Sequence, residues 1–320
     1  MLQKDDLKVL YELDSNYRKT YTEIGKKIRR SEQLISYKIK SFIRQGIIRG
    51  NLPLIDYSRF GLLSFIVLFK TQYRNEQNFK RLIGVITQHG KVSSVIECDG
   101  KYDLMVAFAA QNPSQFNKLL KQVVSQNPEL RDWTILTTVV EHYYLRDYLV
   151  AREGHGDVII GGDRQIIKLD DLNRSIIRLL VQGKKKVVEL ALALETTPKT
   201  IMARLRWLEQ QQIVRGYRLL LDARAMGISS NLILLKYRNI TQEQEENLRQ
   251  FCRYAPPIIE LTKTFGEWDA LLLTETRDRG EFRRLFLQLR ERFDEFIADT
   301  DTFRIFAVHK KQCLPKEIFE

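Results

Sequence analysis

Polar side chains recur at helical spacing in two short stretches of this chain. In the first stretch they stand four, three and four residues apart, and they are Gln33, Tyr37, Lys40 and Arg44. The second stretch carries the equivalent set, in which an alanine replaces one polar residue: Lys199, Ala203, Arg206 and Gln210. Amide, ammonium and guanidinium groups on one helix face can hydrogen-bond to base edges or pair with phosphates. Both stripes are therefore candidate nucleic-acid contacts, and four neighbouring residues are candidates for the same interface: Ser31, Lys38, Thr197 and Arg204.

The alternative interpretation is an ordinary solvated helix face, which is also rich in Lys and Arg. The charge distribution favours the first interpretation. The chain has 320 residues and a formal net charge of +12. Residues 1–50 hold 12 basic and 6 acidic residues, residues 168–216 hold 10 and 5, and the remainder holds 30 and 29. Two separate basic modules explain this distribution, and clustered positive charge is typical of proteins that bind polyanions such as double-stranded DNA.

Each polar stripe needs a helix to display it, and the apolar residues predict one. In the first module, three apolar groups at helical spacing predict three short helices: Leu7, Leu10 and Leu13; Tyr21, Ile24 and Ile28; Ile35, Ile39 and Phe42. Ser31 is placed to cap the third helix, over 32–45, and Gly46 to end it. Short strands at 47–50 and 52–55 then resemble a β-wing, so we expect a winged helix-turn-helix.

The chain contains an internal repeat with a period of 166 residues. The stretch Gln-Gly-Ile-Ile-Arg-Gly at 45–50 returns as Gln-Gln-Ile-Val-Arg-Gly at 211–216, and a Gly-x-x-Asp stretch at 100–103 returns at 266–269. The second copy also repeats the apolar face of the third helix, in Ile201, Leu205 and Leu208. The chain is therefore interpreted as a diverged tandem duplication.

The pattern changes after each basic module. Strand and helix segments at 64–71, 76–88, 91–97, 104–109, 113–124 and 133–140 predict the order βαββαβ, which is the ferredoxin-like arrangement. The same order returns at 231–237, 242–254, 258–263, 270–275, 279–293 and 302–308. We therefore expect an α+β chain. Two winged helix-turn-helix domains (1–55 and 168–221) alternate with two ferredoxin-like domains (62–149 and 228–320), joined by a linker at 150–167.

Each ferredoxin-like domain carries a Gly-x-x-Asp hairpin between its second and third strands. Gly100 and Gly266 suit tight β-turns because glycine tolerates backbone conformations that other residues avoid. The spacing by itself supports a structural role for Asp103 and Asp269, because a turn aspartate can accept hydrogen bonds from backbone amides.

The order of these motifs, found twice, resembles the Lrp/AsnC (feast/famine) family of transcriptional regulators. The resemblance rests on the second helix with Glu23, Ile24 and Gly25, the stretch at 45–50, the opening at Leu169 and Asp170, and both hairpins. It implies sequence-specific DNA binding, and it implies homo-oligomers that pair through the α/β (RAM) domain. It also implies a small effector, commonly an amino acid, bound near the hairpins at Gly100, Asp103, Gly266 and Asp269.

This chain departs from the family's usual form because it fuses two copies. We therefore expect a covalent pseudo-dimer with two unequal halves. Its two reading faces differ, so a single chain that places both helices on one duplex is expected to bind two dissimilar half-sites in a fixed order. If two chains pair first, like helices meet, and a palindrome of either half-site is expected instead.

An enzyme is the main alternative, because siroheme decarboxylases resemble the same fold and also occur as tandem fusions. Their signature places a His where this chain has its hairpins, and neither 98–105 nor 264–271 contains one. The chain also lacks a Gly-x-Ser-x-Gly elbow and a His-Glu-x-x-His motif, so no enzymatic activity is expected. A third alternative is an architectural or purely effector-sensing protein without specific DNA binding.

The remaining features point to neither metals nor membranes. The three cysteines and four histidines are too scattered for a disulfide framework or a zinc site, so no cofactor or metal is expected: Cys98, Cys252, Cys313, His89, His142, His155 and His309. The stretch at 154–162 lacks the Lys-Ser/Thr of a P-loop and is expected to be a flexible linker or loose hairpin. Without a long apolar run or an apolar signal segment, a cytoplasmic location with no membrane partner is expected.

Overall fold

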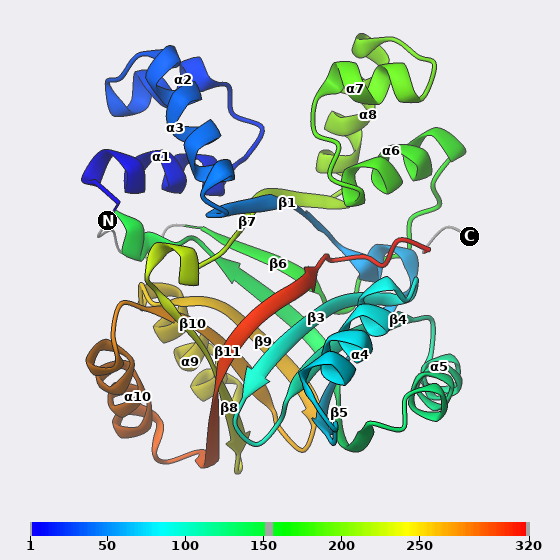
Figure 1. The fold of residues 1–320 in the computed structure, drawn as a ribbon, viewed down its shortest axis with the longest axis vertical. Coiled ribbons are helices and arrows are strands. Elements are labelled where there is room, and N and C mark those ends of the chain that lie inside the picture. The colour runs from blue at the N-terminus through cyan, green and yellow to red at the C-terminus, as the bar shows by residue number, and fades with distance from the viewer. Residues whose placement is uncertain (1, 151–155, 318–320) are drawn as a thin grey trace.

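Two modules of three helices each lie at one end of the molecule (Figure 1). The structure is a computed structural model that describes residues 2–150 and 156–317. The modules consist of α1 (Lys4–Ser15), α2 (Tyr21–Ile28) and α3 (Glu32–Arg44), and of α6 (Asp171–Val181), α7 (Val187–Ala193) and α8 (Pro198–Gln210). The Ser31 hydroxyl accepts a hydrogen bond from the Leu34 amide at 3.3 Å, and the Thr197 hydroxyl accepts one from the Thr200 amide at 3.1 Å. Both third helices therefore begin at a side-chain cap, which confirms the cap predicted at Ser31 and adds one at Thr197.

The strand that follows each third helix pairs with the corresponding strand of the other half. β1 (Ile48–Ile55) is one continuous strand that runs antiparallel to β7 (Val214–Leu221). The prediction that 47–50 and 52–55 form a local pair is therefore wrong, because each eight-residue strand satisfies its backbone groups on its counterpart. Leu52 lies opposite Arg218, its own counterpart 166 residues later, so a local twofold axis passes between them.

The order βαββαβ is confirmed in both halves. The first domain consists of β2 (Leu63–Thr71), α4 (Glu76–Gln88), β3 (Val92–Asp99), β4 (Leu104–Ala110), α5 (Pro113–Gln126) and β5 (Leu130–Tyr144). The second consists of β8 (Ser229–Tyr237), α9 (Gln242–Tyr254), β9 (Ile258–Gly266), β10 (Ala270–Thr276), α10 (Arg279–Phe293) and β11 (Ile297–Lys311). Three short 3₁₀ helices connect the elements: η1 (Tyr57–Phe60), η2 (Asp147–Leu149) and η3 (Arg224–Met226).

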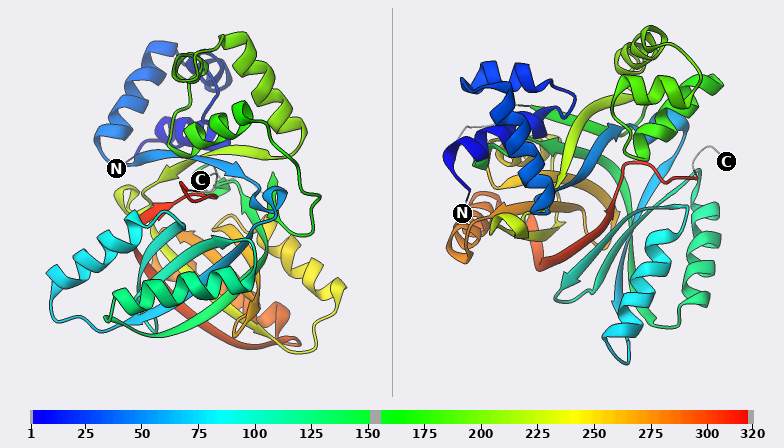
Figure 2. Two further views of the ribbon diagram at one scale, coloured as in Figure 1. Left: turned by 90° about the vertical axis from the view of Figure 1, so that its right-hand side faces the viewer. Right: turned by 45° about the horizontal axis from the view of Figure 1, so that its top comes forward.

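The last strand of each domain is longer than predicted because it crosses into the other domain. β5 pairs first with β2 of its own domain and then with β9 of the other. β11 likewise pairs first with β8 and then with β3. These pairings close a ring of strands in the order β2-β4-β3-β11-β8-β10-β9-β5, which returns to β2. The two α/β domains thus form one continuous structure (Figures 1 and 2).

Alternate residues of the central strands enter different cores. Phe65, Val67 and Phe69 of β2 pack beneath α4 and α5. Ile66 and Leu68 of the same strand pack instead against residues of the second domain, in a core that includes Leu232, Leu234, Trp268, Leu271 and Phe303. The second domain therefore covers the apolar face of the sheet that α4 and α5 leave open.

Part of the segment expected to be a flexible linker is a strand. β6 (Asp157–Gly161) pairs with the end of β5, with Gly161 opposite Val140. Ile160 is completely buried, and the Asp157 carboxylate pairs with Arg249 at 3.0 Å. Of the two alternatives predicted for 154–162, the flexible linker is therefore wrong for 157–161, whereas the hairpin is present, because these residues pair antiparallel with the end of β5. The pairing satisfies a strand edge of β5 that would otherwise be exposed. Residues 151–155, including His155, lie outside the described residues.

Candidate nucleic-acid interface and hairpins

The two predicted reading faces are exposed on both third helices. On α3, Ile35, Ile39 and Phe42 are buried, and the four stripe residues on the opposite face are exposed: Gln33, Tyr37, Lys40 and Arg44. On α8, Ile201, Leu205 and Leu208 are buried, and the exposed residues are Lys199, Ala203, Arg206 and Gln210. The helices lie on either side of the β1–β7 ribbon at the same end of the molecule (Figure 1). One chain thus displays two candidate recognition helices together.

Four of the twelve predicted contact residues are engaged within their own modules. Lys38 forms an ion pair with Asp6, and both side chains are only 14% exposed. Arg204 forms an ion pair with Asp170 at 2.6 Å. Ser31 and Thr197 cap their helices, as described above. The spacing alone could not distinguish these residues from the stripes, because the ion pairs depend on how the first helix packs against the third.

The two modules differ in their second helices, and we did not predict this difference. Lys26 of α2 is exposed, whereas its counterpart on α7 is Leu192, which is 81% exposed. Val188 of α7 is also exposed, at 67%. Three lysines at 184–186, which immediately precede α7, supply positive charge in the second module instead. The 166-residue offset, applied to the second helices, would have revealed this asymmetry.

The hairpin aspartates both accept hydrogen bonds from the chain itself. The Asp103 carboxylate accepts from the Thr71 amide at 2.6 Å and from the Lys70 ammonium group at 3.0 Å. The Asp269 carboxylate accepts from the Tyr237 amide at 2.7 Å, and Lys236 lies within 3.3 Å of it. The expected backbone hydrogen bonds are therefore present in both halves.

The structure gives a second reason, besides turn geometry, for glycine at positions 100 and 266. Gly100 has φ +150° and Gly266 has φ +142°. A Cβ atom on Gly100 would lie 2.9 Å from the Cβ of Phe303, and one on Gly266 would lie 2.6 Å from the Ile135 carbonyl oxygen. Both neighbours belong to the long last strand of the other domain. Glycine is required because the two domains approach each other here.

The two hairpins meet across the axis that relates the halves. Lys101 and Glu267 occupy equivalent positions, and their charged groups lie 3.3 Å apart. The Thr134 hydroxyl donates to the Glu267 carboxylate at 2.9 Å. Gly100 and Gly266 thus border the junction between the α/β domains, and Asp103 and Asp269 lie three residues further along the same hairpins.

Comparisons with known proteins agree with this arrangement. A family model described as winged helix-turn-helix DNA-binding matches residues 4–49. The chain is 30% identical over 126 residues to the HTH-type transcriptional regulator LysM of Sulfurisphaera tokodaii, which covers 39% of this chain and 86% of that protein. It is 28% identical over 127 residues to an uncharacterized HTH-type transcriptional regulator of Pyrococcus furiosus, covering 39% and 84%. These relatives correspond in length to one half of this chain.

The solved structure of the siroheme decarboxylase NirDL is similar to the whole tandem chain. The match covers 98% of this chain and 94% of that one, with a TM-score of 0.61 and 12% identity. At this identity the likeness shows a shared fold. None of the helices in 2–150 and 156–317 is long and apolar enough to span a membrane. The sequence relatives, together with the paired helix-turn-helix modules, show that this chain is a DNA-binding transcriptional regulator and a tandem-duplicated member of the Lrp/AsnC family.

Proposed function

We propose that a single chain binds one DNA site made of two dissimilar half-sites, one contacted by α3 and the other by α8. The observation that carries this proposal is the pairing of the two halves within one chain. β1 lies against β7, and the long strands β5 and β11 each cross into the opposite domain. A dimeric helix-turn-helix regulator presents two identical helices and prefers a palindrome. This chain has a comparable twofold arrangement but presents two different helices.

The two reading faces favour different base edges. The α3 face offers an amide, a phenol and two cations, from Gln33, Tyr37, Lys40 and Arg44. The α8 face offers two cations, a methyl group and an amide, from Lys199, Ala203, Arg206 and Gln210. Because each base pair shows its own pattern of donors and acceptors in the major groove, these faces do not select the same sequence. The order of the half-sites then follows from the fixed relation of the two helices.

Selection of bound sequences from a random DNA pool, with the mass of each winning complex measured, tests this proposal. We expect a consensus of two unlike half-sites and one chain per site. The Arg44→Ala variant should relax the sequence preference of one half-site, and Arg206→Ala should relax that of the other. A clean palindrome bound by two chains would contradict the single-chain arrangement and would support the homo-oligomer through the RAM domains that the family resemblance implies.

We also propose that a small effector, such as an amino acid, binds beside the hairpins and changes DNA affinity. Support comes from the position of Gly100, Asp103, Gly266 and Asp269 at the junction of the α/β domains. Calorimetry with a panel of amino acids tests it. The variants Asp103→Asn and Asp269→Asn keep an oxygen that can accept the backbone amide, so they separate a ligand contact from a structural one. If no amino acid binds the parent protein, the effector proposal fails.

We infer further that the chain regulates transcription by binding DNA and does not catalyse a reaction. The sequence relatives support this inference. The hairpin segments 98–105 and 264–271 support it too, because they contain no His, whereas the siroheme decarboxylase signature places a His there. The direct test is to mix the purified protein with siroheme and to record the absorption spectrum and the products. A shifted tetrapyrrole band together with decarboxylated product would overturn the inference.

A further inference from the structure

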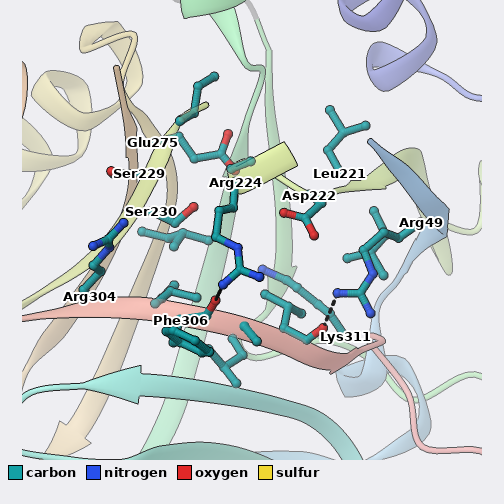
Figure 3. A pocket seen from close by; sticks show the side chains of 18 of the residues that line it. Arg49, Leu221, Asp222, Arg224, Ser229, Ser230, Glu275, Arg304, Phe306 and Lys311 are labelled. Carbon is teal, nitrogen blue, oxygen red and sulfur yellow. Dashed lines mark hydrogen bonds between the residues drawn. The ribbon is translucent and has the colours of Figure 1, made fainter. Parts of the chain in front are cut away.

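A cavity of about 140 Å³ lies where β8 and β11 separate, next to the end of β7 and η3 (Figure 3). β11 pairs with β8 as far as Arg304, which lies opposite Asn231, and then pairs with β3. The space that opens between the two strands is lined by residues of both the helix-turn-helix layer and the α/β layer. Those that matter here are Arg49, Ala223, Arg224, Ser230, Arg304 and Phe306.

The corresponding space in the first half is filled by the protein itself. Tyr57 is the counterpart of Ala223, and it is buried with only 4% of its surface exposed. Strand β6 covers the neighbouring edge of β5, with Gly161 opposite Val140. The counterpart of Val140 is Phe306, and no strand among the described residues pairs with it. The second half therefore has the equivalent space, but Ala223 is too small to fill it and no strand of the described residues covers it.

The unfilled space carries more positive charge than its acidic neighbours balance. Arg49 donates to the Val308 carbonyl oxygen at 2.8 Å, and Arg224 donates to the Phe306 carbonyl oxygen at 3.4 Å. Both acceptors are neutral. Within the described residues, the Arg304 side chain has neither a hydrogen bond nor an ion pair.

Two carboxylates also line the cavity, and one of them is already neutralised. The Glu275 carboxylate is paired with Arg146 at 2.8 Å and also accepts from the Tyr148 hydroxyl at 2.6 Å. Asp222 accepts from the Ala225 amide at 3.2 Å. Asp222 is therefore the one lining carboxylate without an ion pair among the described residues, whereas Arg49, Arg224 and Arg304 all contribute positive charge to the lining. The net charge of the site thus favours an anionic ligand.

The apolar part of the lining limits the size of that ligand. Leu221 and Phe306 contribute hydrocarbon surface, and Ser229 and Ser230 contribute hydroxyl groups (Figure 3). Ile305 also lines the cavity. An engineered cavity of about 150 Å³ accommodates benzene, which sets the scale for a volume of this kind. We propose that this cavity binds a small carboxylate with a short apolar body, of about the size of benzoate. Arg49 and Arg224 hold its carboxylate, and its body occupies the space beside Ala223 that is equivalent to the space filled by Tyr57 in the first half.

Such a ligand would contact the parts that carry both recognition helices. Arg49 lies on β1, five residues after the end of α3, and Arg224 follows β7, which continues from α8. Phe306 belongs to β11 of the α/β layer. A ligand held by all three would restrict how the β1–β7 ribbon sits on the α/β layer, and hence how the recognition helices are presented. This consequence rests on the proposed DNA-binding arrangement, whereas the binding step does not.

Calorimetric titration of the full chain with benzoate, in the absence of DNA, tests the binding step. We expect benzoate to bind and benzyl alcohol, its neutral analogue, to bind at least about tenfold more weakly, because charged hydrogen bonds are the stronger ones. Ala223→Tyr copies the first half's own filling and should abolish binding. Ala225→Tyr places the same side chain on an exposed residue two positions away and should leave binding unchanged.

A second pair of variants keeps the test decisive if Ala223→Tyr does not fold. Arg224→Gln should weaken benzoate binding about tenfold, and Arg283→Gln, at an exposed position of α10, should not. The proposal is overturned if the parent does not bind benzoate, if Ala223→Tyr folds and binds normally, or if inorganic phosphate competes as well as benzoate does. A palindromic DNA site bound by two chains would leave these binding results intact, so the two proposals fail separately.

Discussion

Lys38 and Lys40 lie two residues apart on α3, and their surroundings differ. Lys40 is exposed on the reading face, and its side chain has no ion pair within the described residues. Lys38 is paired with Asp6, and both side chains are 14% exposed. We therefore compare Lys40→Gln with Lys38→Gln, since the two changes remove the same charge from the same helix.

The expected magnitudes follow from these surroundings. A lysine that neutralises one DNA phosphate contributes about 0.9 to the slope of log affinity against log salt concentration. Raising the salt fourfold should therefore weaken the parent about 3.5-fold more than Lys40→Gln. Lys38→Gln should leave that slope nearly unchanged. It should instead lower the free energy of unfolding by about 1–2 kcal/mol, because it leaves Asp6 partly buried without its partner.

Fluorescence anisotropy with labelled operator DNA at several KCl concentrations measures the slopes, and urea denaturation measures the stabilities. Arg206→Gln and Arg204→Gln provide the same comparison on α8. The loss of stability should be below about 1 kcal/mol for Arg204→Gln, since the Arg204 and Asp170 side chains are 37% and 49% exposed. If Lys38→Gln flattens the slope as much as Lys40→Gln and does not change stability, the assigned face is wrong.

Three further predictions concern the frame of the molecule. Asp14 is buried and bonds to Arg218 at 2.6 Å, so Asp14→Ala should cost about 3–5 kcal/mol in urea denaturation by leaving the buried Arg218 guanidinium without an anionic partner. Burial, and then the nearby Glu260 carboxylate, raises the pKa of Glu141 from an ordinary value of 4.5 to about 7. Between these values the unfolded chain loses the proton first, so stability should fall by about 1–3 kcal/mol as the pH rises from 4.5 to 7 and then level off. Glu141→Gln should remove that fall in pH-dependent thermal unfolding, and an unchanged profile would refute the assignment. Gly266→Ala should cost about 1–3 kcal/mol, whereas Gly84→Ala, with no atom within 4 Å of the added Cβ, should stabilise α4 by about 0.5–1 kcal/mol; equal effects in thermal unfolding would contradict the proposed close approach.

The elements of the fold could be predicted because they depend on residues close together in the chain. The helices at 76–88, 242–254 and 279–293 begin and end where the apolar periodicity placed them. The strands β5 and β11 were predicted too short, at 133–140 and 302–308. Their additional N-terminal residues pair with β2 and β8 of their own domains, whereas their additional C-terminal residues pair with β9 and β3 of the other domain. A local pattern carries no information about a partner so distant in sequence.

In the candidate site too, features set by local sequence could be predicted and features set by distant partners could not. The exposed stripes of α3 and α8 could be predicted because a buried apolar face at helical spacing leaves the opposite face to solvent. The engagement of Lys38 with Asp6 could not, since α1 must first be placed against α3. The cavity beside Arg224 could not be predicted either, because it results from a tyrosine in one half and an alanine in the other.

The sequence by itself determined the duplication, the order of the domains, the family and the exposed basic faces, since each is recorded in residue types at short or fixed spacing. Only the tertiary structure decided that the halves close on each other, that 157–161 completes one sheet edge, and that no strand of the described residues covers the matching edge of β11. These features depend on contacts such as the one between Arg49 and Val308, which are 259 residues apart. The two groups come within hydrogen-bonding distance only after both halves have folded, so no local stretch of the sequence records the contact.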